Sequence, residues 1–513
     1  MAAKKRFEEL DARRAHLQAG GGAEKIARQH EQGKLTARER LGLLFDDDSF
    51  IEFGLWVKHR CPDLADREFP ADGVVTGKGE IMGRPVFAFS QDFTVGGGAV
   101  GERHAAKIVE MLQTALKCGI PVVGFNDGGG ARIQEGVNAL SAYGRIFYHN
   151  TLLSGVVPQI SVIAGPCAGG AAYSPALTDF VIMIENTAHM FIAGPEVIRA
   201  ATGEVISEED LGGARAHATI AGNVQFMAAD EEEAVSTVKA LLRYLPQNNM
   251  DTPPSRPFDG IVVDNEAMDD IIPEDPRAAY DVKEVIELLV DDGVYLEYMT
   301  GFAPNIVCAF AHLGGMAVGI VANQPQVMAG VLDINAADKA ARFIRSCNVY
   351  NVPLITLVDV PGFLPGVAQE HGGIIRHGAK MLFAYSAATV PKLTVILRKA
   401  YGGAFLAMCS KDVGAETVLA WPTAEIAVMG PEGAARVLHK KAIKAATNSA
   451  AVFQEKVAEY REQHANPFRA AEELHIDDII RPSWTRRLLI ERLGLLRTKR
   501  DLRPQKKHGN MAL

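Results

Sequence analysis

The sequence predicts an α/β protein made of two similar halves, and three observations predict it. Its 513 residues, 48% of them hydrophobic, are enough for two or three domains with buried cores. Short apolar runs alternate with stretches of helical periodicity, which is typical of α/β units around a largely buried sheet. Related segments recur at a nearly constant distance along the chain, so both halves should share one fold.

The first half shows this alternation most clearly. Residues 86–89, 121–125 and 160–163 are short apolar runs that predict buried strands. Residues 102–118 carry apolar side chains at helical spacing and predict a helix between two of these strands. Strands separated by helices of this kind favour a mainly parallel sheet.

The repeat relates the second half to the first. GIPVVGFNDGGG precedes NVPLITLVDVPG by 232 positions, which places Asp127 on Asp359. VVPQISVIAGPCAGGAAY precedes TVPKLTVILRKAYGGAFL by 233 positions, which places Gly169 on Gly402. Lys107 and Lys339 also correspond, at an offset of 232. The two halves therefore follow one plan, with one residue inserted between the matching segments.

A linker is predicted between the halves. Residues 248–276 contain five prolines and many acidic residues and lack helical periodicity. We therefore expect two domains, 1–254 and 255–513.

Composition and charge exclude several classes of protein. Asp+Glu 62 against Lys+Arg 53 gives a formal net charge of -9, which argues against general nucleic-acid binding. The six cysteines are far apart, and no C-x-x-C or H-E-x-x-H motif is present, which argues against a metal site and a disulfide framework. The charged N-terminus lacks a secretory signal, and prolines interrupt the uncharged stretch 150–178, so we expect a cytoplasmic protein without a membrane span.

The C-terminal segment is basic and amphipathic. Residues 481–510 carry ten Lys+Arg, and Leu488, Leu489, Leu493 and Leu496 form one helical face. We expect this face to pack against another subunit rather than to bind nucleic acid.

The most distinctive feature of each half is a strand that runs into a Gly-Gly turn and then a helix. The two segments are ISVIAGPCAGGAAYSPAL, residues 160–177, and LTVILRKAYGGAFLAMCS, residues 393–410. Glycine permits a left-handed backbone and close approach of a ligand, and the first N–H groups of a helix lack intrahelical partners. Such backbone donors suit a developing oxyanion, so both turns are candidate oxyanion holes.

Other interpretations of these segments stay open. The glycine pairs alone also fit tight strand-to-helix packing. Gly165 to Gly169 fits a G-x-C-x-G nucleophile elbow, with Cys167 as nucleophile and His189 or His371 as base. Position 400, which corresponds to Cys167, is alanine, so the halves share backbone donors and not a thiol. The glycine-rich segment 126–140 could cradle a phosphate, but it lacks both phosphate-loop motifs.

Several motifs together resemble the carboxyltransferase subunits of biotin-dependent acyl-CoA carboxylases. The resemblance runs from Lys34 almost to the C-terminus and is closest to the propionyl-CoA and methylmalonyl-CoA members, including transcarboxylase and decarboxylase subunits. It implies two tandem crotonase-like domains, a homohexamer, and a partner that supplies biotin carboxylase and biotin carboxyl carrier functions. The motifs are SQDFTVGGG, DGGGARIQEG, SGVVPQISVIAGPCAGGAAYSPALTDF, VANQPQVMAGVLD, VDVPGFLPG, QEHGGIIRHGAKML and RKAYGGAF.

The resemblance also implies a reaction and its residues. Carboxybiotin and the α-carbon of a short-chain acyl-CoA would exchange a carboxyl group through an enolate. The first domain would take the acyl-CoA, with Gly169 and Gly170 on the thioester oxygen, and the second would take biotin, with Gly403 and Ala404 on its ureido oxygen. The sequence lacks an A-M-K-M biotinylation motif, so biotin must arrive on another chain. The implied substrate-binding residues are Cys167, Ala168, Gly130, Ala131, Phe405 and Leu406.

One position departs from the family pattern. Propionyl-CoA carboxylases usually have aspartate where this chain has Leu406, whereas transcarboxylase and methylmalonyl-CoA decarboxylase subunits more often carry an aliphatic residue. The alternative function is therefore a subunit that runs the reaction in reverse, in a decarboxylase or transcarboxylase. A crotonase-like or cysteine hydrolase and a non-catalytic scaffold are the competing classes.

Overall fold

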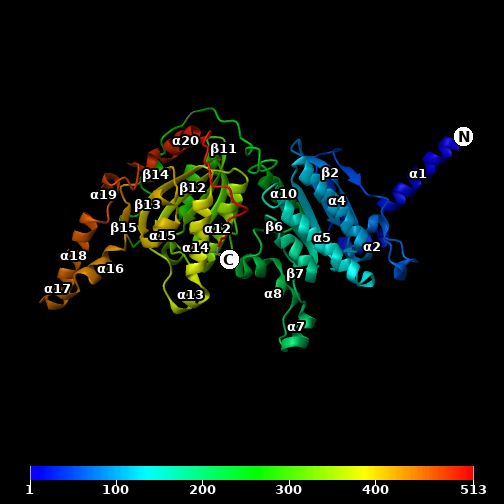
Figure 1. The fold of residues 1–513 in the computed structure, drawn as a ribbon, viewed down its shortest axis with the longest axis horizontal. Helices are drawn as coiled ribbons and strands as arrows, with labels where there is room; N and C mark the ends of the chain where they lie inside the picture. The colour runs from blue at the N-terminus through cyan, green and yellow to red at the C-terminus, as the bar shows by residue number, and fades with distance from the viewer. Residues whose placement is uncertain (1, 261, 276, 512–513) are drawn as a thin grey trace. The chain divides into compact units, whose positions relative to one another are not determined.

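The computed structural model describes residues 2–260, 262–275 and 277–511. The chain forms two compact units, Met1–Thr252 and Pro253–Leu513. Each unit is built around one eight-stranded sheet (Figure 1). The two sheets have the same plan, as the sequence repeat predicts.

The sheet of the first unit has the order β1-β2-β3-β4-β5-β6-β8, and the short strand β7 pairs with β5. From β3 to β8 neighbouring strands are parallel, and β1, β2 and β3 are antiparallel. The three apolar runs predicted as strands lie in β3, β4 and β5. The strands are β1 Ile51–Phe53, β2 Val74–Ile81, β3 Arg84–Gln91, β4 Val122–Gly128, β5 Gln159–Ala168, β6 Phe180–Ile184, β7 His189–Phe191 and β8 Phe226–Ala228.

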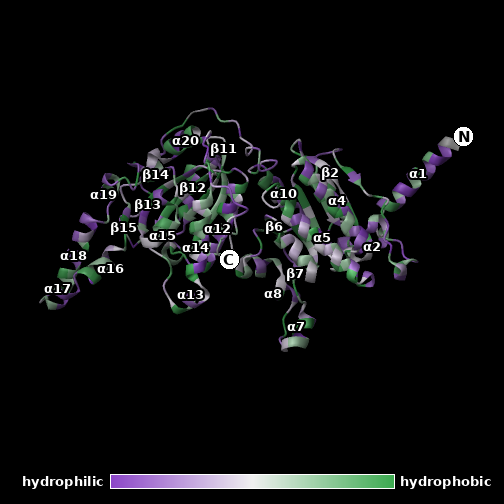
Figure 2. Ribbon diagram, in the orientation of Figure 1, coloured by the Kyte–Doolittle hydropathy of each residue, from purple (hydrophilic) through white to green (hydrophobic). Residues whose placement is uncertain are grey.

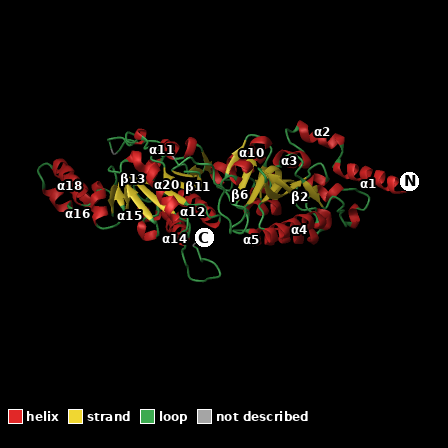
Figure 3. Cartoon of the chain, turned by 90° about the horizontal axis from the view of Figure 1, so that it is seen from above, coloured by secondary structure: helices red, strands yellow, loops and turns green. Residues whose placement is uncertain are grey.

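Helices cover both faces of this sheet. The view in Figure 3 places α4 and α5 on one face and α3 and α10 on the other. Helix α4 has the bounds that the sequence predicts, and it ends where Gly119 adopts a left-handed backbone with φ 64°. The helices are α1 Ala2–Gln18, α2 Ala23–Glu31, α3 Ala37–Leu44, α4 Glu102–Cys118, α5 Val137–Leu153, α6 Tyr173–Ala176, α7 Pro195–Thr202, α8 Glu208–Gly212, α9 Ala214–Ala216 and α10 Glu231–Leu242.

The second unit repeats this arrangement. Its sheet has the order β16-β14-β13-β12-β11-β10-β9, with β15 paired to β13. Strands β11, β12, β13 and β14 are parallel, like their counterparts β3 to β6. The strands are β9 Tyr295–Tyr298, β10 Ile306–Leu313, β11 Met316–Asn323, β12 Leu354–Val360, β13 Lys392–Tyr401, β14 Thr417–Ala420, β15 Glu425–Ala427 and β16 Asp478–Ile479.

The helices of the second unit differ from those of the first mainly near the C-terminus. Helices α16, α17 and α18 extend away from the sheet of their own unit (Figure 1). The helices are α11 Val282–Leu289, α12 Ile334–Val349, α13 Val367–Gly372, α14 Ile374–Ala387, α15 Gly402–Ala407, α16 Pro431–Leu438, α17 Lys440–Ala445, α18 Ser449–Gln463, α19 Pro467–Glu472 and α20 Thr485–Leu496.

The apolar face of the C-terminal helix corrects one prediction. Leu489 and Leu493 of α20 are buried in the hydrophobic core of the second unit, beside β10, β11 and β13, and Leu488 and Leu496 pack against it. Figure 2 shows hydrophobic residues on the strands of both sheets and mixed hydrophobic and hydrophilic residues along the helices. The apolar face that we expected to pack against another subunit therefore packs against the core of its own unit.

The predicted linker has little regular structure. Between Pro253 and residue 275, the described residues contain one short 3-10 turn, Glu266–Met268. Pro276, the last residue of the predicted linker, lies outside the described residues. None of the helices in the described ranges is both long and apolar enough to cross a membrane.

Candidate active site

In each unit the Gly-Gly turn comes directly after an inner strand of the sheet, β5 or β13. Strand β5 ends at Ala168, and β13 ends at Tyr401. The next residues, Gly169 and Gly402, have left-handed backbones with φ of 63° and 59°. Any other residue is strained in this conformation, which explains why the chain has glycine at both positions.

The second glycine of each pair lies in the first turn of a helical segment, the 3-10 helix Gly169–Ala172 in the first unit and α15 in the second. Gly170 and Gly403 are both exposed. A Cβ added at Gly403 would meet nothing within 4 Å, and one at Gly170 would meet only the ring of Tyr143, at 3.8 Å. Each of these glycines is the second residue of its helical segment, where a backbone N–H has no carbonyl of the same helix to bind. These N–H groups are therefore available to a ligand, as expected for the first turn of a helix.

In the second unit the turn borders a large cavity of about 740 Å³. Gly403, Phe405 and Leu406 of the predicted site line this cavity together with Gly402. The fourth predicted residue of the turn, Ala404, is buried beside them, at 1% exposure. Residues from β15 and from α16, α18 and α19 form the rest. They are Asp412, Ile426, Ala427, Val428, Leu438, Tyr460, His464, Arg469, Ala470, Glu473 and His475.

In the first unit the predicted substrate residues also come together. Cys167 pairs with Gly128 on β4, and a Cβ on Gly130 would lie 3.2 Å from the carbonyl oxygen of Ala168. Ala131 forms an isolated bridge with Val100 on the same side. The glycine-rich segment therefore runs alongside the strand that leads into the first Gly-Gly turn.

Buried ion pairs fix the shape of the glycine-rich segment. The guanidinium of Arg132 donates to Asp72 and to Glu135, both at 2.8 Å, and it lies over the ring of Phe69. Burial raises the pKa of Asp72, and the charge of Arg132 opposes this rise. Because its single arginine is already paired twice, this segment lacks a free cation for a phosphate.

The geometry does not support Cys167 as a nucleophile. Its thiol is 2% exposed, and burial, reinforced by the charge of Asp127, raises its pKa to about 12. A reactive cysteine needs an accessible thiolate. The ring of His189 is hydrogen bonded to Glu209 at 3.0 Å, and His371 belongs to the other unit. No group of three or more metal-binding side chains is found among the described residues.

Comparison with known proteins identifies the family. The model of the carboxyl transferase domain matches residues 28–511. The chain belongs to the carboxyl transferase family.

Three similar proteins represent different members of this family. The methylmalonyl-CoA decarboxylase subunit alpha of Propionigenium modestum is 52% identical over 100% of this chain and 99% of its own length. The propionyl-CoA carboxylase beta chain of Saccharopolyspora erythraea is 51% identical over 98% of this chain and 95% of its own. The crystal structure of transcarboxylase 12S, solved as a hexamer with methylmalonyl-coenzyme A bound, is 55% identical and superimposes with a TM-score of 0.97 over 99% of this chain and 98% of that one.

These similarities confirm the expected fold and enzyme class. The chain consists of two crotonase-like domains and is a carboxyltransferase subunit of the type found in biotin-dependent acyl-CoA carboxylases and transcarboxylases. The hydrolase and scaffold interpretations are not supported.

The structure also shows features that the sequence interpretation missed. The repeat aligns Gly403 with Gly170 and Ala404 with Ala171. The donors predicted for the second unit, Gly403 and Ala404, therefore lie one position later in the repeat than Gly169 and Gly170, the donors predicted for the first unit. The carboxylates of Asp127 and Asp359 lie buried next to β5 and β13, just before the turns. Their correspondence was visible in the sequence as part of the repeat, but nothing in the pattern indicated this placement.

Proposed function

We propose that this chain transfers a carboxyl group between biotin, carried by a partner, and the α-carbon of a short-chain acyl-CoA of the propionyl-CoA and methylmalonyl-CoA type. One observation carries the proposal: in each unit of this carboxyltransferase a left-handed glycine follows an inner strand of the sheet, and an exposed glycine in the first turn of a helix comes next. Two oxyanions develop in such a transfer, and the chain offers two sets of backbone donors.

The turn of the first unit serves the thioester in this proposal. The N–H groups of Gly169 and Gly170 hold the thioester oxygen as the α-carbon becomes an enolate, which lowers the free energy of the charged state. Ala171 is an additional candidate donor because it corresponds to Ala404. Cys167, Ala168, Gly130 and Ala131 form the adjoining wall, where the backbone of Gly130 already approaches Ala168 closely.

The turn of the second unit fits biotin. A cavity of about 740 Å³ has room for the bicyclic ring, and Gly403 faces it without a side chain. Phe405 and Leu406 provide apolar walls, and the N–H groups of Gly403 and Ala404 provide donors for the ureido oxygen. When bound, biotin carries the carboxyl group and supplies the nitrogen that accepts the α-proton. The chain's part is to bind both reactants, align them and stabilise negative charge.

Leu406 supports transfer of the carboxyl group from the acyl-CoA to biotin as the physiological direction of the reaction. Its side chain lines the cavity and is 39% exposed. An aliphatic residue here resembles transcarboxylase and decarboxylase subunits, so we propose that the chain works in an assembly of one of these types. We further propose a homohexamer that binds a biotin carboxyl carrier partner. The cytoplasmic location stays a prediction.

A direct assay tests the proposal. Purified protein incubated with free biotin and methylmalonyl-CoA should form propionyl-CoA, and omission of biotin should stop the reaction. Failure to decarboxylate any malonyl-type thioester, by protein that still binds coenzyme A, would contradict the proposed function.

A further inference from the structure

Strands β5 and β13 each carry a bulge just before the Gly-Gly turn. Between β12 and β13, Val358 pairs with Ile396 and Val360 pairs with Ala400, so Asp359 stands opposite three residues, 397–399. Between β4 and β5, Asp127 stands opposite residues 164–166 in the same way. A bulge bends its strand and redirects the residues after it. In both units, the residues after the bulge form the glycine turn.

In the second unit the carboxylate of Asp359 binds the bulge itself. One oxygen accepts a hydrogen bond from the backbone N–H of Lys399 at 3.0 Å, and the other accepts from Nε of Arg398 at 2.9 Å. Asp359 is 1% exposed, and its own N–H donates to Asn323 at 3.2 Å. The guanidinium of Arg398 also lies over the ring of Tyr280. The bulge therefore has a fixed partner on the neighbouring strand.

The bulge of the first unit cannot supply the same donors. Gly165 replaces the arginine, and Pro166 replaces the lysine whose N–H is used, because proline has no N–H. A Cβ on Gly165 would lie only 1.9 Å from Oδ1 of Asp127, so no side chain fits there. The carboxylate nevertheless occupies the same place.

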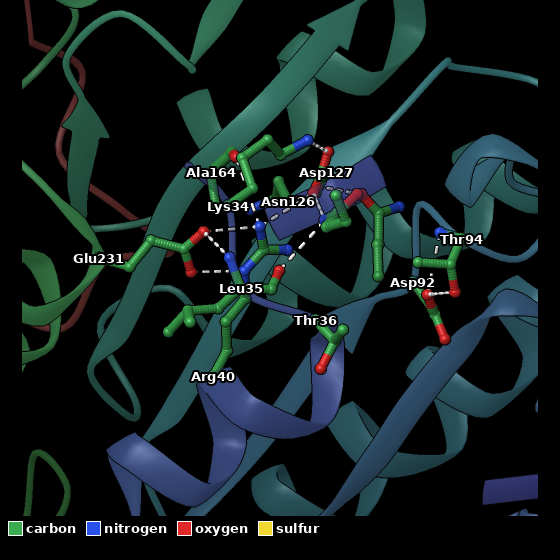
Figure 4. A network of polar contacts seen from close by, with 12 residues as sticks. Lys34, Leu35, Thr36, Arg40, Asp92, Thr94, Asn126, Asp127, Ala164 and Glu231 are labelled. Carbon is green, nitrogen blue, oxygen red and sulfur yellow. Dashed lines mark hydrogen bonds and ion pairs between the residues drawn. The ribbon is translucent and has the colours of Figure 1, made fainter. Parts of the chain in front are cut away.

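Distant residues supply the missing donors in the first unit. Nζ of Lys34 lies 2.6 Å from one oxygen of Asp127, and Nη2 of Arg40 lies 2.9 Å from the other. Arg40 also donates to the carbonyl oxygen of Ala164 in the bulge, at 3.4 Å, and pairs with Glu231. Figure 4 shows Lys34 and Arg40 converging on Asp127 beside Ala164. Asp127 is completely buried.

We propose that Asp127 and Asp359 are positioning residues whose carboxylates fix the two bulges and so aim the N–H groups of the two glycine turns. Both units have a carboxylate opposite the bulge, although the residues that donate to it come from unrelated parts of the chain. A simple packing role would not require the same group after both neighbours had changed. This inference rests on the proposed function, since it assigns these residues to its two oxyanion holes.

The test compares Asp359→Asn with wild type in the assembled protein. The asparagine is similar in size but has one oxygen and one N–H₂, so either Arg398 or the N–H of Lys399 loses its acceptor and faces a donor, and the turn should shift. A misplacement of about 1 Å at a reacting centre lowers the rate by about 10²-fold. We expect a loss of that order in kcat for biotin-dependent decarboxylation of methylmalonyl-CoA, with the KM for methylmalonyl-CoA unchanged. Asp127→Asn should behave in the same way.

Lys339→Met is the matched control for loss of a buried charge. Nζ of Lys339 is buried in the same unit and binds the carbonyl oxygens of Phe302 and Ile306, away from the turn. This variant should lose thermal stability but keep its kcat when assayed well below its Tm. Denaturant unfolding followed by circular dichroism reports the folded fraction of each variant. The loss in Asp359→Asn should persist at low temperature after this correction, whereas loss from unfolding should disappear.

The outcomes of these measurements separate the positioning role from the proposed function. A folded Asp359→Asn protein with wild-type kcat overturns the positioning role, and so does a loss that disappears on cooling. If Asp359→Asn does not fold, Arg398→Lys replaces it, because it keeps a cation beside the carboxylate and removes the Nε donor. A folded Arg398→Lys protein with wild-type kcat also overturns the inference, and a reduced kcat supports it. An inactive wild-type protein would instead contradict the proposed function.

Discussion

Gly402 passes so close to the carbonyl oxygen of Val428 that a Cβ added at this glycine would lie 3.0 Å from that oxygen. The backbone φ of Gly402 is also positive, at 59°. In the first unit, a Cβ on Gly169 would lie 3.8 Å from the carbonyl oxygen of Ile192, so only the backbone conformation requires glycine there. The second turn is thus constrained by both conformation and space.

Replacement of Gly402 tests this constraint. We expect Gly402→Ala to lower the free energy of unfolding by about 1–2 kcal/mol because of the left-handed backbone. Carboxyl transfer should fall by about 10²-fold because the turn must shift. Denaturant unfolding and steady-state kinetics measure the two effects. Gly494→Ala in α20, where a Cβ meets nothing within 4 Å, is the control and should leave activity intact. Wild-type activity in Gly402→Ala would contradict the geometry.

Cys167 should be dispensable for catalysis. Because its pKa is raised to about 12, its thiol stays protonated at neutral pH, and its burial shields it from reagents. We expect Cys167→Ala to retain activity, and iodoacetamide to label the exposed Cys118 without inhibiting the enzyme. Mass spectrometry locates the label. Complete inactivation of a folded Cys167→Ala protein would restore the nucleophile interpretation.

Lys107 should make stability depend on pH. Burial lowers its pKa from 10.5 to about 8, although Nζ still donates to the carbonyl oxygens of Ala71 and Val74. Below pH 8 the lysine is protonated in both states, and the folded state bears the cost of a buried charge. Between pH 8 and 10.5 only the unfolded state keeps the proton, so the free energy of unfolding rises with pH, by roughly 3 kcal/mol in all.

The comparison with Lys107→Met isolates this contribution. Unfolding free energies measured across that pH range should rise in wild type relative to Lys107→Met. Lys117→Met, at an exposed position of the same helix, should show no such difference. A constant difference between wild type and Lys107→Met would contradict the lowered pKa.

Leu406 should influence acyl-chain preference. It lines the cavity that we propose for biotin, which the acyl α-carbon must approach for the carboxyl group to be transferred, and one pocket contact changes discrimination by roughly 1–3 kcal/mol. We expect Leu406→Asp to reduce kcat/KM for butyryl-type thioesters by about 10-fold or more relative to propionyl-type ones, because the carboxylate disfavours added apolar groups. Competition assays with both thioesters measure the ratio. An unchanged ratio would place this side chain away from the acyl group.

Much of the fold could be predicted because the sequence repeat and the alternation of apolar runs with helical stretches are visible without knowledge of the tertiary contacts. The bounds of α4 and the strands that contain 121–125 and 160–163 are explained by apolar spacing and by the glycine that ends the helix. The C-terminal helix was misplaced because amphipathicity shows that one face is buried but not against which surface. Leu489 and Leu493 find their partners in strands that lie much earlier in the chain, such as β10 and β11.

The candidate site was only partly predictable for a similar reason. Glycine pairs before helices are visible in the sequence, so the two turns could be found. The role of the carboxylates of Asp127 and Asp359 could not be predicted from the sequence. Asp127, for example, binds Lys34 and Arg40, which lie on a distant segment. Pairing across such distances depends on the fold and leaves no local pattern.

Replacement of one backbone N–H by an ester oxygen tests the central claim most directly. Lactic acid in place of Ala404 removes the amide donor and keeps the methyl side chain, and the same change at Gly494 serves as control. The account predicts a fall in kcat of about 10²- to 10³-fold for the ester at position 404, with the KM for acyl-CoA little changed. Wild-type kcat in this protein, folded and binding coenzyme A, would contradict the claim that main-chain donors stabilise the charge.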